Sequence, residues 1–226
     1  TRCGAPGDHY RFNGLNLAGP TIIACGDEAQ KQTYLPPILK GEVLWCQGFS
    51  EPAAGSDLAA LQTRGVIDGD ALVVNGAKIW TSWARFADWQ QLLVRTDPAA
   101  PKHQGISWVI NRMDNPGMQI RPIRDMAGGD DLHEVSYADV RIPLANVVGG
   151  LNNGWRVSMA QLAFERGTAF MPSQIETQKT IEELIELART VRLEDGRLAI
   201  DDDHIAYQLA TLRAETRSLL AMTLMG

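Results

Sequence analysis

The sequence predicts an α+β protein of more than one domain, in which an antiparallel β-barrel or β-sandwich is flanked by all-helical domains. Two observations support this fold class. Apolar residues recur at helical spacing toward both ends of the chain, whereas the middle alternates short apolar-rich strands with turn sequences and holds no helix-length pattern. We therefore expect three domains, at residues 1–41, 42–150 and 151–226.

The first helical part contains a recognisable start and stop. In "DEAQKQTYLPPILKGE", Asp27 is followed three residues later by Gln30, the spacing of a capping box that opens a helix. We expect Pro36 and Pro37 to break or restart this helix, because proline has no amide hydrogen to donate. Gly41 is expected to end it.

The middle part reads as a series of strands. The strand-like stretches are "LQTRGVI", "ALVV", "KIWTS", "WQQLLVRT", "GISWVIN" and "EVSYADVRI". The sequences "IDGDA" and "VNGAK" contain Asp-Gly and Asn-Gly, which favour two-residue hairpin turns. We therefore expect a tight hairpin at each of these two sites.

The last part returns to helical spacing. Residues 181–191 and 205–219 each carry an apolar stripe at intervals of three and four. Asp201, Asp202 and Asp203 precede the second stripe, and any of them can cap that helix. A metal site at this acidic triplet is the alternative.

Composition limits the class of partner. The net charge of -6 argues against nucleic acid or an anionic membrane surface, which require clustered Lys and Arg. Cys3, Cys25 and Cys46 are odd in number and widely spaced, so we expect free thiols and neither a disulfide framework nor a metal.

The ends of the chain and its hydropathy predict location. No stretch approaches the ~20 apolar residues of a membrane span, and no signal segment opens the chain. We expect a soluble intracellular protein, in the cytoplasm of a bacterium or the mitochondrial matrix of a eukaryote. The start at Thr1 and the stop at Gly226, inside a helical pattern, suggest a piece of a longer polypeptide.

Four stretches resemble one enzyme family. In "WCQGFSEPAAGSD" a buried strand runs into a small-residue turn, and residues 48–57 resemble the flavin-binding signature of the acyl-CoA dehydrogenases, with Phe49 in place of an aliphatic residue. The stretches "GDEAQKQTYLPPILKGE", "VVNGAKIWTSWARFADWQQLLVRTD" and "NNGWRVSMAQLAFERG" also resemble that family and follow its order. The resemblance implies helical-bundle domains on either side of the β-domain, both incomplete here.

The resemblance implies an FAD site built from two segments. Contacts to the cofactor are expected from Gln47, Gly48, Phe49, Ser50, Gly55, Ser56, Trp80, Thr81 and Ser82. Main-chain amides and the Ser50 hydroxyl would meet the polar edge of the flavin, and Ser56 would reach the pyrophosphate or the acyl-CoA substrate. Trp80 would stack near the flavin, while Ser82, where the family usually has Thr, would bond N5.

Several of these residues have plainer interpretations. "AAGSD" alone also fits an ordinary surface turn, and Trp80 alone also fits a core tryptophan. Glu51 and Asp57 could form an acid pair, but we interpret them as structural, with backbone amides as their partners. His133 stands where the family usually has Asn.

Glu165 is the residue that we expect to act as catalytic base. Much of the family places its base near the carboxy terminus, but a subgroup places it one residue before an arginine, and "LAFERG" puts Glu165 and Arg166 there. Arg166 would steady the site electrostatically. Glu165 shares a helix face with Gln161 and Ser158, and this polar strip fits either a ligand cavity or a solvated surface.

The resemblance implies FAD-dependent α,β-dehydrogenation of an acyl-CoA thioester to the trans-2-enoyl-CoA. A carboxylate takes the α proton and the β hydrogen leaves as hydride to flavin N5. Fatty acid β-oxidation, an electron-transfer flavoprotein as acceptor, and assembly as a dimer, tetramer or heteromer would follow. The alternatives are a flavin oxidase or monooxygenase, and a non-catalytic subunit that completes a partner's flavin site.

Overall fold

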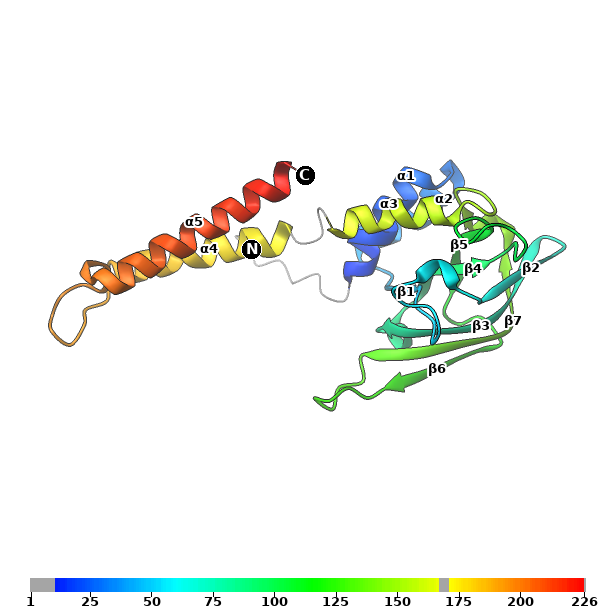
Figure 1. Cartoon of the computed structure of the whole chain (residues 1–226), viewed down its shortest axis with the longest axis horizontal. Coiled ribbons are helices and arrows are strands. Elements are labelled where there is room, and N and C mark those ends of the chain that lie inside the picture. Colours follow the sequence, from blue (N-terminus) through cyan, green and yellow to red (C-terminus); the bar gives the residue numbers. More distant parts are fainter. Residues whose placement is uncertain (1–10, 167–170, 226) are drawn as a thin grey trace. The chain divides into compact units, whose positions relative to one another are not determined.

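The structure is a computed structural model that describes residues 11–166 and 171–225, with the backbone alone at Arg166 (Figure 1). The chain forms two compact units, one of residues 7–163 and one that includes residues 164–226. We call them the sheet unit and the helical unit.

The sheet unit opens with helices: a π-helix Asn13–Ala18, α1 (Gly19–Cys25) and α2 (Glu28–Lys40). The capping box is confirmed, because Asp27 Oδ1 accepts from the Gln30 amide at 2.8 Å and Gln30 Oε1 accepts from the Asp27 amide at 3.1 Å. Gly41, with φ of 68°, ends α2 as expected.

The predicted break at Pro36 and Pro37 is wrong. Both prolines lie inside α2, which continues to Lys40. Proline at these positions deprives the carbonyls of Gln32 and Thr33 of their helical partners. Gln32 and Thr33 are exposed, so water can bond those carbonyls and the helix tolerates the loss.

Eight strands form one sheet, whose order is β6-β7-β3-β2-β4-β5-β8, with β1 also paired to β4. The strands are β1 (Trp45–Gly48), β2 (Arg64–Asp68), β3 (Ala71–Ser82), β4 (Trp89–Arg95), β5 (Ile106–Arg112), β6 (Met118–Ile123), β7 (Leu132–Pro143) and β8 (Val147–Val148). Within residues 11–166 and 171–225 the strands do not close into a barrel. The sheet is also not purely antiparallel, because β1 and β2 each run parallel to β4. The long excursion between β1 and β4, which includes the β2–β3 hairpin, allows this parallel pairing.

One of the two predicted hairpins is confirmed. Gly69, with φ of 64°, turns the chain between β2 and β3. The Asn75-Gly76 hairpin is wrong, because β3 runs straight through these residues with a register shift against β7. A Cβ on Gly76 would lie 2.6 Å from the Thr63 Oγ1, so glycine serves close backbone approach here and not a turn.

The sheet unit has two hydrophobic clusters. One joins the helices to the strands and includes Ile22, Tyr34, Trp45, Trp108 and Val157. The other consists mainly of strand residues from β3, β4, β5 and β7. β1 contributes Trp45 to the first cluster and Cys46 to the second, whereas β3 packs in the second cluster through Leu72 and Val74.

The helical unit contains a helical hairpin, α4 (Met171–Ala188) and α5 (Asp203–Met225) (Figure 1). Asp202 caps α5, since its Oδ1 accepts from the amides of His204 and Ile205 at 3.1 and 3.2 Å. Within the described residues no group of three or more His, Cys, Asp or Glu side chains could hold a metal. The helix α3 comprises Gly154–Arg166, of which residues 154–163 belong to the sheet unit and residues 164–166 to the helical unit.

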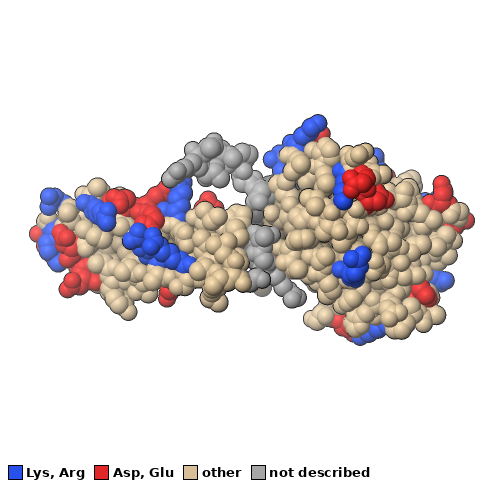
Figure 2. Space-filling view, turned by 90° about the horizontal axis from the view of Figure 1, so that it is seen from above, with Lys and Arg blue, Asp and Glu red and all other residues tan. Residues whose placement is uncertain are grey.

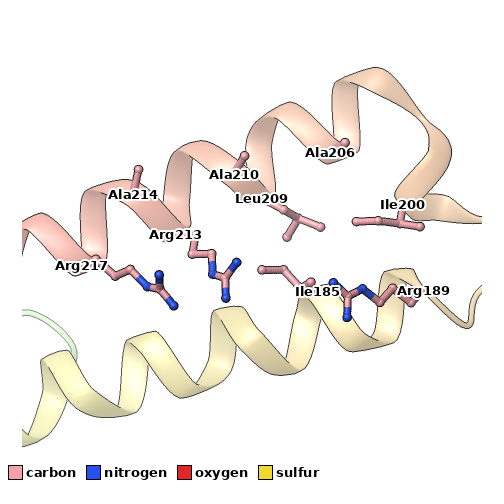
Figure 3. Close-up of a pocket in the computed structure, with 9 residues that line it drawn as sticks. All are labelled: Ile185, Arg189, Ile200, Ala206, Leu209, Ala210, Arg213, Ala214 and Arg217. Carbon is pink, nitrogen blue, oxygen red and sulfur yellow. The ribbon is translucent and has the colours of Figure 1, made fainter.

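A groove of about 490 Å³ runs along this hairpin (Figure 3). Arg213 and Arg217 point from α5 toward α4, where Glu182 pairs with both at 2.7 and 3.3 Å. Glu182 therefore offsets part of their positive charge within the hairpin. On the face that Figure 2 shows, positive and negative side chains are interspersed. Within residues 11–166 and 171–225, no helix has the length and hydropathy that crossing a membrane requires.

Candidate functional site

Two segments that are distant in sequence meet beside β1. We call residues 49–57 the corner and residues 78–82 the β3 edge. The Ile79 amide donates to the Ser50 carbonyl at 2.9 Å, and the Lys78 ammonium donates to the Phe49 carbonyl at 3.1 Å. The two segments that the sequence assigned to the flavin are thus neighbours in space.

The corner is a small closed turn. Glu51 and Ala54 exchange two backbone hydrogen bonds, at 2.8 and 3.1 Å, which leave Pro52 and Ala53 exposed at the tip. Gly55 follows, and a Cβ there would meet no protein atom within 4 Å. Neither packing nor a left-handed backbone requires glycine at this position, and the space beside its backbone is open.

Glu51 holds the corner in place from inside. Its carboxylate accepts from the amides of Gln62 and Thr63, at 2.7 and 2.9 Å, and from the Lys78 ammonium at 2.7 Å. Burial raises the pKa of Glu51, but Lys78 and these hydrogen bonds outweigh it and hold the pKa below its usual value. The structural interpretation of Glu51 therefore agrees with its contacts. Asp57 pairs with Lys102 at the surface, not with Glu51.

Trp80 is not a core residue, so that alternative interpretation is wrong. Its side chain is 55% exposed and its φ is 61°, a left-handed conformation that costs a bulky residue on the order of 1–2 kcal/mol. The conformation falls in a register shift of β3 against β7, between Lys78 and Thr81. The chain therefore accepts strain to present a large aromatic side chain outward.

Thr81 and Phe49 reach the site only through their main chains. The Thr81 side chain is fully buried, and its carbonyl bonds His133 Nδ1 at 3.2 Å. The Phe49 side chain is buried in the helix–strand cluster. Among the described residues, the Thr81 hydroxyl and His133 Nε2 have no hydrogen-bond partner.

The other predicted contacts differ in exposure. Gln47, Ser50 and Ser82 are half-buried and Ser56 is exposed, so their polar side chains can reach a ligand. Gly48 is buried, and a Cβ there would lie 2.6 Å from Gln90 Nε2. Packing against the Gln90 side chain therefore favours glycine at residue 48.

Glu165 lies near the end of α3 and is half-buried, but it belongs to the helical unit. The Arg166 side chain lies outside the described residues. Ser158 and Gln161 are fully buried, and Gln161 accepts from Trp108 Nε1 at 2.8 Å. A solvated strip is therefore the wrong interpretation for Ser158 and Gln161.

Lys78 is the residue that the sequence reasoning missed. Its side chain is fully buried, and burial lowers its pKa to about 8 although Glu51 opposes the shift. A lysine within an apolar-rich strand, two residues before Trp80, was the available signal. Its partner could not be read from the sequence, because Glu51 lies 27 residues earlier.

Comparison with known proteins identifies the family. Residues 46–140 match the acyl-CoA dehydrogenase middle domain, and residues 152–225 match the acyl-CoA dehydrogenase C-terminal domain. The chain belongs to the acyl-CoA dehydrogenase family.

Its relatives are longer proteins. Acyl-CoA dehydrogenase IpdE1 of Mycobacterium tuberculosis is 43% identical over 87% of this chain and 51% of its own length. Among solved structures, the Tcur3481-Tcur3483 steroid ACAD has a TM-score of 0.76 and 36% identity, covering 94% of this chain and 53% of that one. The ChsE4-ChsE5 complex from Mycobacterium tuberculosis has a TM-score of 0.72 and 37% identity, covering 98% and 56%. This chain thus spans about half the length of such relatives.

FAD is the cofactor of this family, and the site has features that suit it. An exposed aromatic face at Trp80, open space at Gly55 and accessible hydroxyls at Ser50 and Ser82 are what an isoalloxazine ring and its polar edge require. The exposed face of Trp80 and the open space beside Gly55 are not explained by packing of the sheet unit.

Proposed function

We propose that the complete protein removes two hydrogens from the α and β carbons of an acyl-CoA thioester and yields the trans-2-enoyl-CoA. The observation that carries this proposal is the outward, strained Trp80 held beside the corner by the Ser50–Ile79 hydrogen bond. Bound FAD supplies the two-electron acceptor for this chemistry.

Each residue of the site has a distinct part in the proposal. Trp80 covers the flavin and excludes water from it, and the hydroxyls of Ser50 and Ser82 orient the ring by hydrogen bonds. Main-chain amides of the corner meet the polar edge of the cofactor. Glu165 takes the α proton, and an apolar acyl pocket around it would raise its strength as a base.

A steroid-derived acyl group is the substrate that the relatives favour. One solved relative is described as a steroid ACAD and is 36% identical to this chain. We propose an acyl-CoA whose acyl part is attached to a steroid ring system, in place of the straight fatty acyl chain that the motifs alone imply.

A heteromeric assembly is the corresponding proposal for partners. The solved relative from Mycobacterium tuberculosis is a ChsE4-ChsE5 complex. We propose that the complete protein pairs with a second, related chain, and that an electron-transfer flavoprotein reoxidises the flavin.

The test is to mix the FAD-loaded complete protein with an acyl-CoA in the absence of oxygen and to monitor reduction of the flavin by its visible absorption. A steroid side-chain CoA thioester should bleach the flavin, and palmitoyl-CoA should do so more slowly. Bleaching by palmitoyl-CoA alone would reject the steroid substrate but keep the dehydrogenase. A flavin that no acyl-CoA bleaches would reject the dehydrogenase and leave an oxidase or a non-catalytic subunit.

A further inference from the structure

A buried ion pair joins the corner to the β3 edge. The Lys78 side chain has no exposed surface, Glu51 is 8% exposed, and Nζ lies 2.7 Å from Oε1. Withdrawing two charges from water is costly, and apolar replacements of such pairs often leave a protein as stable or more stable. Stability alone is therefore a weak reason for this pair.

The contacts of the pair show what it holds. Lys78 also donates to the Phe49 carbonyl, at the start of the corner. Glu51 also accepts from the amides of Gln62 and Thr63, which follow the corner. One buried pair thus bonds the first residue of the corner, residues 62–63 beyond the corner, and the β3 edge.

The same pair lies next to the predicted flavin contacts. Glu51 adjoins Ser50, and Lys78 precedes Trp80 by two residues. Ser50 and Ile79, which neighbour Glu51 and Lys78 in the sequence, are joined by a backbone hydrogen bond. A shift of Lys78 relative to Glu51 therefore changes the separation of the Ser50 hydroxyl and the Trp80 ring.

We propose that the Glu51–Lys78 ion pair positions the corner against the β3 edge and so sets how tightly and in what environment the flavin is held. Both are positioning residues, since neither is among the expected flavin contacts. This inference rests on the proposed function, which makes these two segments the FAD site.

Titration of the pair gives a second signature. The pKa of Lys78, about 8 in the fold, is lower than the ~10.4 of an unfolded lysine. Two other ionisable groups act on Glu51 electrostatically. Arg95 on β4 stays cationic, and burial raises the pKa of Tyr137 on β7 well above its usual value. Near pH 8, Lys78 is therefore the group of this cluster that changes charge.

Deprotonation of Lys78 should change the free energy of unfolding and the affinity for FAD in opposite directions. Between about pH 8 and about pH 10.4 the unfolded chain binds more protons at Lys78 than the folded chain, so this residue makes unfolding less favourable as pH rises. Loss of the ammonium charge weakens the hold on Glu51, so FAD affinity should fall over the same range. A purely structural pair would move stability and affinity together.

The experiment compares FAD titration of the complete apoprotein with that of Lys78→Met, Glu51→Gln and the double variant. Lys31→Met, at an exposed ion pair on α2, is the matched control. We expect Lys78→Met to weaken FAD binding by about tenfold or more, to shift the visible circular dichroism of the flavin, and to lower stability, because Glu51 is left buried without its partner. The double variant should be no worse than Lys78→Met alone, because both changes remove one interaction.

Unchanged FAD affinity and flavin spectrum in a folded Lys78→Met protein would overturn the inference. If Lys78→Met does not fold, the FAD affinity of Glu51→Gln and the pH dependence of the parent's FAD affinity still test the inference. An affinity of the parent that does not change between about pH 7 and about pH 10 would contradict the proposed role of the ion pair. A parent protein that binds no FAD would instead refute the proposed function, and this inference with it.

Discussion

Trp80 has a strained backbone conformation and an exposed side chain. A tryptophan at φ of 61° is strained, and its exposed side chain gains little from burial that would offset the strain. The sequence around it, "KIWTS", reads as an ordinary strand, so the left-handed conformation could not be predicted. It depends on the register shift against β7, which is a property of the pairing and not of the residue.

Replacing Trp80 separates folding from cofactor binding. Glycine tolerates the left-handed backbone, so Trp80→Gly apoprotein should be more stable than Trp80→Ala apoprotein by about 1 kcal/mol in urea unfolding. Both variants should bind FAD more weakly than the parent, because both lack the aromatic face. A Trp80→Gly protein that retains the parent's FAD affinity would contradict the proposed contact.

Glu165 tests the chemistry itself. Glu165→Gln removes a proton acceptor while keeping size and polarity, so turnover of an acyl-CoA should fall by about a thousandfold or more with FAD content unchanged. Glu176→Gln, at an exposed position of α4, is the control. Equal turnover in Glu165→Gln and the parent would place the base elsewhere in the complete protein.

At the scale of elements, local sequence determines where α2 begins, whereas long-range contacts determine where α2 lies in the fold. Its capping box was predictable, because both hydrogen bonds join residues three apart. Gln30 also donates to the carbonyls of Ala145 and Val147, more than a hundred residues later. These bonds attach α2 to the end of the sheet, and no local sequence pattern predicts them.

Removing the cap should cost a measurable amount. Asp27→Ala leaves the Gln30 amide without its acceptor, so we expect the free energy of unfolding to fall by about 1 kcal/mol. Glu28→Ala, in the exposed first turn, should cost clearly less. Chemical denaturation of both variants checks this, and equal losses would mean that the cap bonds contribute nothing.

Predictability follows sequence separation across the whole molecule. The two-residue turn at Gly69 and the cap at Asp27 are short-range, and both were predicted. The mixed strand directions, the course of β3 through Gly76 and the Glu51–Lys78 pair depend on partners far along the chain, and they were missed. The two flavin segments were assigned from their motifs, and their adjacency emerged only in the structure.

The helical hairpin exposes large apolar side chains, among them Leu184, Leu187 and Leu219. Monomeric proteins rarely leave such surface uncovered, so we expect the rest of the complete protein or its assembly to cover it. Leu187→Lys should then lower the free energy of unfolding by about 2 kcal/mol or more, whereas Thr180→Lys on the same helix should change it little. Thermal unfolding of the complete protein measures both, and equally small shifts would show that Leu187 faces water.

The contrast among the tryptophans gives the protein a built-in optical reporter. Trp45 and Trp108 are sealed in the interior, whereas Trp80 faces outward at the proposed ring site. A small collisional quencher in solution should quench the exposed Trp80 indole before the buried ones. A flavin bound over Trp80 should protect that indole from the quencher and should itself quench its fluorescence. Occupancy of the site can therefore be followed by light, without any label attached to the chain.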